Sequence, residues 1–140
     1  MKPRVKVCCI SSVAEAAIAV RHGAAALGLV SAMPSGPGVI AEETIAEIAV
    51  TVPPGVATFL LTSKRDADSI IAQQRRCRTN AIQLCDSVEA GCYAKLRDAL
   101  PGISLVQVSM LLARNRWMKR WQSRGWLTQS CSIPGIKSSP

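Results

Sequence analysis

The sequence predicts an α/β protein in which four strand–helix units are followed by a fifth strand, so that helices cover a parallel sheet. Short apolar runs alternate with segments of helical period, and each repeat spans roughly 22 to 30 residues, which suits right-handed βαβ units. The chain has 140 residues, of which 49% are hydrophobic and 19% charged. This composition predicts a single core and excludes disorder for most of the length.

The first unit begins with an apolar run rich in β-branched residues, 5–10, which is suited to a buried parallel strand. Ser12 and Glu15 form a capping box, in which Glu15 is expected to reach back to the Ser12 amide. We expect Gly23 to follow the end of this helix. The face that we expect to be buried carries Val13, Ala16, Ala17 and Val20.

The remaining elements are predicted from the same two patterns, short apolar runs for strands and helical spacing of apolar residues for helices. A strand over 25–30 leads into a loop rich in glycine and proline, 31–38. Pro53-Pro54 ends one of the predicted helices and Pro101-Gly102 ends another. The other predicted elements are a helix carrying Ile45, Ile48, Ala49 and Val52, a strand over 56–61, a helix over 66–78, a strand over 81–84, a helix that begins at Ser87 and carries Cys92, Leu96 and Ala99 or Leu100 inward, and a strand over 103–108.

Several function classes receive no support. The six cysteines form no CxxC pair and His22 is the only histidine, so we expect no metal site. Neither GxGxxG nor GxxxxGK[ST] is present, which gives no support for a nucleotide cofactor. No apolar run is long enough to span a membrane and no secretory signal is apparent. We therefore expect a cytoplasmic protein with reduced cysteines.

Several ordered segments resemble the phosphoribosylanthranilate isomerase family. Lys6-Val7-Cys8-Cys9-Ile10-Ser11 is similar to the segment that opens these enzymes, K-[IV]-C-G-[IL]-[TS]. The similarity covers about residues 4–108, and its further segments are Ala16-Ala17, His22-Gly23-Ala24, Ala26-Leu27-Gly28-Leu29-Val30 and Ala81-Ile82-Gln83-Leu84-Cys85. The resemblance implies a partial (β/α)8 TIM barrel, with four βα units and a fifth strand.

The resemblance also implies an activity and a set of site residues. The family performs an Amadori rearrangement in tryptophan biosynthesis, converting an aminoaldose phosphate to an aminoketose phosphate without metal or cofactor. Cys8 falls on the general base at the carboxyl end of the first strand, and Gln83, Cys85 and Gly38 fall on substrate-binding positions. The alternatives are that Cys8 is a small buried apolar residue and that Gln83 is a satisfied structural amide.

Three residues depart from the family pattern at these positions. Cys9 replaces a glycine, Gly38 replaces an arginine that holds the anionic substrate, and Cys85 replaces a histidine. Losing the cationic anchor should weaken anthranilate binding by a few kcal/mol if nothing replaces it.

The family's general acid ends the sixth strand and its phosphate loops follow the seventh and eighth, whereas no acidic residue follows Asp98 here. We therefore expect a truncated chain that lacks isomerase activity. In the full-length relative the partner would be the sugar phosphate. An open half-barrel would also leave unpaired parallel edges, through which we expect self-association.

The chain changes character after residue 109, which divides it into 1–109 and a basic tail, 110–140. The tail holds six Lys and Arg, no Asp or Glu and all three tryptophans. It could be a non-enzymatic nucleic-acid-binding segment, an amphipathic helix on a membrane surface, or an out-of-frame translation without a stable fold. We favour the third interpretation, so we expect neither nucleic acid nor membrane as a partner.

The codons implied by the tail support that interpretation. In the frame shifted by one base, Trp117-Met118 must encode aspartate and Met118-Lys119 must encode glutamate, whatever codons are used. With permissible codons, 110–121 reads as a polar loop and an acidic helix start, and 127–136 as an apolar strand that ends in an acid. We therefore predict a single-base loss after codon 108.

Overall fold

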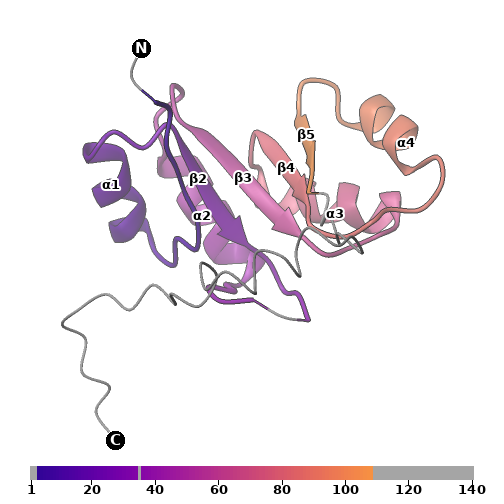
Figure 1. The fold of residues 1–140 in the computed structure, drawn as a ribbon, viewed down its shortest axis with the longest axis horizontal. Helices are drawn as coiled ribbons and strands as arrows, with labels where there is room; N and C mark the ends of the chain where they lie inside the picture. The colour runs from indigo at the N-terminus through magenta and orange to yellow at the C-terminus, as the bar shows by residue number, and fades with distance from the viewer. Residues whose placement is uncertain (1–2, 35, 109–140) are drawn as a thin grey trace, which may run out of the picture. The chain divides into compact units, whose positions relative to one another are not determined.

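A computed structural model describes residues 3–34 and 36–108. In these residues, helices and strands alternate and the strands form one parallel sheet in chain order, β1-β2-β3-β4-β5, which confirms the predicted architecture (Figure 1). The elements are β1 (Lys6–Val7), α1 (Val13–Arg21), β2 (Ala26–Val30), α2 (Glu42–Thr51), β3 (Ala57–Thr62), α3 (Ala67–Cys77), β4 (Ala81–Leu84), α4 (Cys92–Ala99) and β5 (Ser104–Gln107).

The sheet has one face packed against helices and one face turned away from them. Residues paired across parallel strands point to the same side, and successive residues along a strand alternate. Leu29 pairs with Leu60, and both are fully buried. Gly28 pairs with Phe59 on the opposite side, which we call the open face. Lys6, Cys8 and Gln83 also belong to the open face by this alternation.

The core lies between the sheet and the helices in two clusters of buried side chains. The first joins β1, β2 and β3 to α1 and α2, with Leu27, Ile45 and Ile48 at its centre. The second joins β4 to α3 and α4 around Ile70, Ile82 and Leu96. Burying a Leu or Ile side chain contributes about 1.5–3 kcal/mol, so this packing fixes which face of the sheet stays open.

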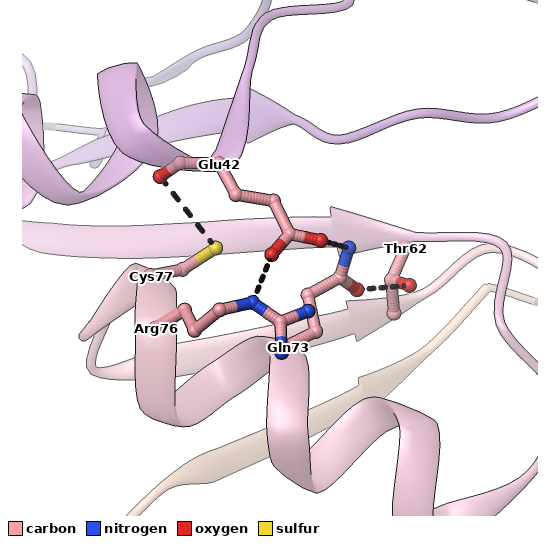
Figure 2. Close-up of polar contacts among 5 residues, drawn as sticks. All are labelled: Glu42, Thr62, Gln73, Arg76 and Cys77. Atoms are coloured by element: carbon pink, nitrogen blue, oxygen red, sulfur yellow. Dashed lines mark hydrogen bonds and ion pairs between the residues drawn. The ribbon is translucent and has the colours of Figure 1, made fainter.

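A polar network fastens α2 to α3 and to the end of β3 (Figure 2). The carboxylate of Glu42, in the first turn of α2, accepts hydrogen bonds from Gln73 (2.9 Å) and Arg76 (2.5 Å) of α3. Gln73 is buried, and its carbonyl oxygen accepts a hydrogen bond from Thr62 (2.7 Å). The network therefore satisfies a buried amide that the apolar core could not.

Four details differ from the sequence-based expectations. The first strand is only Lys6–Val7 and not 5–10, because Cys9 adopts φ 61° and the chain leaves the ladder there. The fourth helix begins at Cys92 and not at Ser87, since Gly91 (φ 77°) precedes it. Ala17 is exposed on α1, although it was expected on the buried face.

The fourth difference is the capping box of α1. Ser12 accepts the Glu15 amide (3.2 Å) as predicted, but the Glu15 carboxylate accepts the amide of Ser11 (2.7 Å) and not that of Ser12.

No helix in the described part of the chain is long and apolar enough to cross a membrane. The basic tail, 110–140, lies outside the described residues, as does the nucleic-acid hypothesis that rests on it.

Candidate active site at the carboxyl end of the sheet

Cys8 lies immediately after β1, at the carboxyl end of the parallel strands. Its side chain is exposed and lies on the open face, over Gly28 of β2. A Cβ built at Gly28 would lie 2.8 Å from the Cys8 sulfur and 3.2 Å from the Cys8 Cα. Real Cβ atoms do not approach this closely, so the glycine provides the space that the Cys8 thiol occupies. Sequence reasoning did not assign Gly28 a role.

The loop after β1 is held by the N-terminus of α1. Glu15 accepts hydrogen bonds from both the amide and the hydroxyl of Ser11, at 2.7 and 2.9 Å. The bond from the Ser11 amide is the larger cause of a lowered pKa of the Glu15 carboxyl. Ile10 then donates its amide to the carbonyl of Gly28 (3.3 Å). The segment that carries Cys8 and Cys9 is therefore held by the pairing of β1 with β2 before it and by these contacts of Ile10 and Ser11 after it.

Cys9 and Gly38 meet where the β1–α1 loop passes the β2–α2 loop. A Cβ built at Gly38 would lie 2.6 Å from the Cys9 Cβ, and Gly38 itself has φ 77°. The Cys9 thiol donates a weak hydrogen bond to the carbonyl of Pro37 (3.6 Å). The position at which the resemblance would place an arginine is therefore occupied, in space, by the side chain of Cys9.

Gln83 of β4 lies on the open face with partners on two sides. Its carbonyl oxygen accepts a hydrogen bond from the Lys6 ammonium, which also lies 4.3 Å from the centre of the Phe59 ring. Its amide nitrogen donates to the sulfur of Cys85, at 3.8 Å, just beyond the end of β4. Lys6 and Phe59 were not singled out from the sequence, although a lysine two residues before Cys8 in a strand shares its face.

The loops after β3 and β4 are joined at the same end of the sheet. Arg65 donates to the carbonyl of Ser87 (3.0 Å) and accepts the amide of Glu89 (3.1 Å). Cys8, Gly38, Gln83 and Cys85 thus all lie on or just beyond the carboxyl ends of β1, β2 and β4. Within the described residues, no hydrogen bond joins Cys8 to Gln83 or Cys85.

The other thiols are placed differently, as expected for cysteines on helices. Cys77 ends α3 and Cys92 begins α4, and both are buried. Burial raises the pKa of the Cys77 thiol to about 12, and burial also raises the pKa of Cys92. The five cysteines of the described segment are all free, and Cys131 lies outside it.

Within 3–34 and 36–108, no three side chains of His, Cys, Asp or Glu gather as a metal site. The arrangement instead offers exposed thiols, an amide and a lysine at the ends of parallel strands. In a sheet of successive βα units this is where barrel enzymes place their chemistry. The fold defines the class: part of a (β/α)8 TIM barrel, with the candidate site at the carboxyl ends of its strands.

Solved structures specify this class further. The chain is similar to a phosphoribosyl anthranilate isomerase in complex with reduced 1-(o-carboxyphenylamino)-1-deoxyribulose 5-phosphate, with 25% identity, a TM-score of 0.67 and coverage of 88% of this chain and 61% of that chain. The isomerase from Thermotoga maritima matches with 25% identity and a TM-score of 0.66, over 88% of this chain and 58% of that chain. The isomerase from Thermococcus kodakaraensis matches with 18% identity and a TM-score of 0.73, over 88% of this chain and 57% of that chain.

The fold is therefore that of a partial phosphoribosylanthranilate isomerase barrel, as the resemblance implied. The chain spans about 60% of the length of these solved chains. No protein-family model and no curated protein sequence matches it.

Proposed function

We propose that this chain is the N-terminal part of a phosphoribosylanthranilate isomerase-like enzyme and that Cys8 is its general base. The single observation that carries the proposal is the place of Cys8: an exposed thiol at the carboxyl end of β1, on the open face, with Gly28 making room for it. Barrel enzymes use this end of the strands for catalysis. The alternative, a small apolar residue in a core, does not suit an exposed side chain.

The reaction proposed for the complete barrel is an Amadori rearrangement. An acid opens the sugar ring of the aminoaldose phosphate to a Schiff base, and the Cys8 thiolate removes the proton from C2. The electron pair of that C–H bond moves into the C1–C2 bond as the C1–N double bond becomes single. The resulting enolamine then tautomerises to the aminoketose phosphate. Ring opening breaks the bond between C1 and the ring oxygen as that oxygen takes a proton from the acid, and the later steps transfer protons only, so the proposal requires no oxidant, reductant or metal.

Substrate contacts are proposed at Gln83 and Cys85, with Gly38 lining the corner beside Cys9. We further propose that the ligand is a sugar phosphate related to the one bound in the solved complex, and that the protein works in the cytoplasm, where exposed thiols such as Cys8 and Cys9 stay reduced.

The 140-residue chain is expected to show no measurable isomerase activity. The family's general acid and phosphate loops have no counterpart in the sequence after Asp98. Losing one member of an acid–base pair typically costs about 10²–10⁴-fold in rate. Turnover of phosphoribosylanthranilate by the purified chain at a rate like that of a whole barrel would contradict this.

The role of Cys8 is tested in the chain produced when one base is restored after codon 108. Cys8→Ser should reduce the isomerase rate by about 10²–10⁴-fold, because a serine hydroxyl is a far weaker base than a thiolate. Cys9→Gly is the matched control, since it removes the neighbouring thiol and leaves Cys8 in place. A Cys8→Ser variant with the rate of its parent would exclude Cys8 as the base.

A further inference from the structure

The open face carries a lysine whose role the sequence comparison leaves undefined. Lys6 belongs to β1, but its ammonium crosses the sheet to reach Gln83 of β4 and lies over the Phe59 ring of β3. The β2 residues on this face are Ala26, Gly28 and Val30, and the two nearest to Lys6 along the strand are Ala26, which pairs with it, and Gly28. Because both are small, the long side chain can pass over β2 without a clash.

The Lys6 contact determines the orientation of the Gln83 amide. An ammonium group only donates hydrogen bonds, so the atom of Gln83 that faces it must be the carbonyl oxygen. The NH₂ group is then turned the other way, toward Cys85 at the carboxyl end of β4. Without Lys6, the amide could bind in either of two orientations that differ by half a turn.

We propose that Lys6 is a positioning residue that holds the Gln83 NH₂ group toward the candidate active site, where it donates to an acceptor oxygen of the ligand. Only the identity of the ligand in this proposal rests on the function proposed above. Gln83 currently donates to the Cys85 sulfur at 3.8 Å, and a thiol is a weak acceptor. A hydroxyl, carboxylate or phosphate oxygen of a sugar phosphate is a stronger acceptor and can replace it.

The Phe59 ring defines the path of the Lys6 side chain. Its centre lies 4.3 Å from the Lys6 nitrogen, a distance typical of a cation–π contact. The ring lies below the lysine on the same face because Phe59 pairs with Gly28. Lys6 is therefore held by a ring on β3 and an amide on β4, and it can transmit changes at β1 to Gln83.

The test uses the side-chain amide signals of Gln83 in ¹⁵N-labelled 140-residue chain. In the parent we expect an NOE from the Gln83 NH₂ protons to the Cys85 Hβ protons, and Lys6 Hε protons shifted upfield by the Phe59 ring. Lys6→Met keeps the apolar stem and removes the donor, so the NOE to Cys85 should weaken by at least half. Lys6→Arg keeps a donor and should restore it.

Lys95→Met is the matched control, because Lys95 pairs with Asp68 away from the open face. It should leave the Gln83 signals unchanged. If Lys6→Met leaves the Gln83 NOE at its parental strength, Lys6 does not orient the amide. If Lys6→Met does not fold, the parent alone decides: absence of the Lys6 shift or of the Gln83–Cys85 NOE overturns the proposal.

A titration with reduced 1-(o-carboxyphenylamino)-1-deoxyribulose 5-phosphate, performed on the chain produced when one base is restored after codon 108, separates this proposal from the proposed function. A ligand that binds through Gln83 should shift its NH₂ signals in the parent and in Lys6→Arg, and shift them at least twofold less in Lys6→Met. An absence of any ligand-induced shift counts against the proposed substrate class and against the ligand-donor role of Gln83. The NOE comparison still decides whether Lys6 orients the amide.

Discussion

The side chain of Cys9 occupies the space into which any side chain at Gly38 would project. A Cβ at Gly38 would lie 2.6 Å from the Cys9 Cβ and 3.0 Å from its Cα. The two residues are the departures from the family pattern on the β1–α1 and β2–α2 loops, and in space they form one contact. Cys9 also carries a positive φ of 61°, which a glycine would adopt without strain.

Cys9→Gly is expected to stabilise the protein. A non-glycine residue in the left-handed region costs about 1–2 kcal/mol, and the added chain entropy of glycine offsets about 0.4–1 kcal/mol of that. The free energy of unfolding should therefore rise by about 0.5–1 kcal/mol, measured by urea denaturation. Arg78→Gly is the matched control, since Arg78 follows α3 with φ 56° and should show a similar gain. A loss of stability in Cys9→Gly alone would show that its side-chain contacts outweigh the strain.

Gly38→Ala is expected to destabilise the protein, and the loss should depend on residue 9. In the parent the new methyl group meets both the Cys9 side chain and a φ of 77°, so we expect a cost of about 2–4 kcal/mol. In the Cys9→Gly background the contacts with the Cys9 side chain are removed, so the cost should be smaller: backbone strain of about 1–2 kcal/mol and the contact with the Cα of residue 9 remain. Equal costs in the two backgrounds, measured by a double-mutant cycle, would mean that the loops separate on substitution.

The sequence was sufficient to predict the order of the elements, because apolar periodicity and chain stops are local properties. The strand over 81–84 has the bounds that were predicted, and Ile45, Ile48 and Leu96 are buried as expected. The sequence could not predict the end of β1, since a cysteine gives no signal for a left-handed residue. Nor could it place Ser87 in a loop, because the turn there depends on contacts with Arg65.

The candidate site, like the fold, could be predicted from the sequence only in part. The resemblance placed Cys8 and Gln83 by their neighbours along the chain, whereas the contacts of Gln83 with Lys6 and of Cys8 with Gly28 cross between strands. Such contacts depend on strand register, which a single sequence specifies only through the alternation of faces. The contact between Cys9 and Gly38 depends on the conformations of two loops, so the sequence of neither loop alone could predict it.

Gly28→Ala is expected to displace Cys8 without unfolding the protein. The new methyl group would lie 2.8 Å from the Cys8 sulfur, so the thiol must move away from β2. We expect the rate of Cys8 alkylation by iodoacetamide at pH 8, resolved by peptide mass spectrometry, to change at least twofold. Cys77 provides an internal standard, because burial and a pKa of about 12 leave it almost unreactive in folded protein.

The control for this substitution is Gly55→Ala, since nothing lies within 4 Å of a Cβ at Gly55. It should leave the Cys8 alkylation rate unchanged. If Gly28→Ala also leaves that rate unchanged while Cys77 stays protected, Gly28 does not position the thiol.

The Glu42 network should make part of the stability depend on pH. The hydrogen bond from Arg76, followed by that from Gln73, lowers the pKa of the Glu42 carboxyl below its ordinary value of 4.5. Because the folded state has the lower pKa, the carboxylate stabilises the fold fully above the ordinary value, and this contribution is lost as the pH falls through the lowered pKa. Glu42→Gln should therefore cost about 0.5–1 kcal/mol at pH 7, as for a partly exposed ion pair.

The difference in the free energy of unfolding between Glu42→Gln and the parent should become smaller as the pH is lowered. Denaturation at several pH values between 7 and 3 measures this difference. Glu43→Gln, one residue along the same helix turn, is the matched control. Glu42→Ala should cost about 1–3 kcal/mol at neutral pH, because it leaves the buried Gln73 amide without its acceptor. A Glu42→Gln difference that is constant over this pH range would contradict the assigned role of the Arg76 pair.

The gene is expected to lack one base directly after codon 108. With permissible codons, Val108-Ser109-Met110 can be encoded by GTG-TCC-ATG, and restoring an A then gives GTG-ATC-CAT-G and shifts the frame of every later codon. In that frame Trp117-Met118 must contribute an aspartate and Met118-Lys119 a glutamate, because the Trp and Met codons are unique and both lysine codons begin with AA. The family pattern requires acids in this region, and the present frame contains none from residue 99 onward. The nucleotide sequence of this locus decides the matter: the shifted frame should stay open beyond codon 140 and complete a barrel, whereas a stop codon soon after the junction would reject the single-base loss.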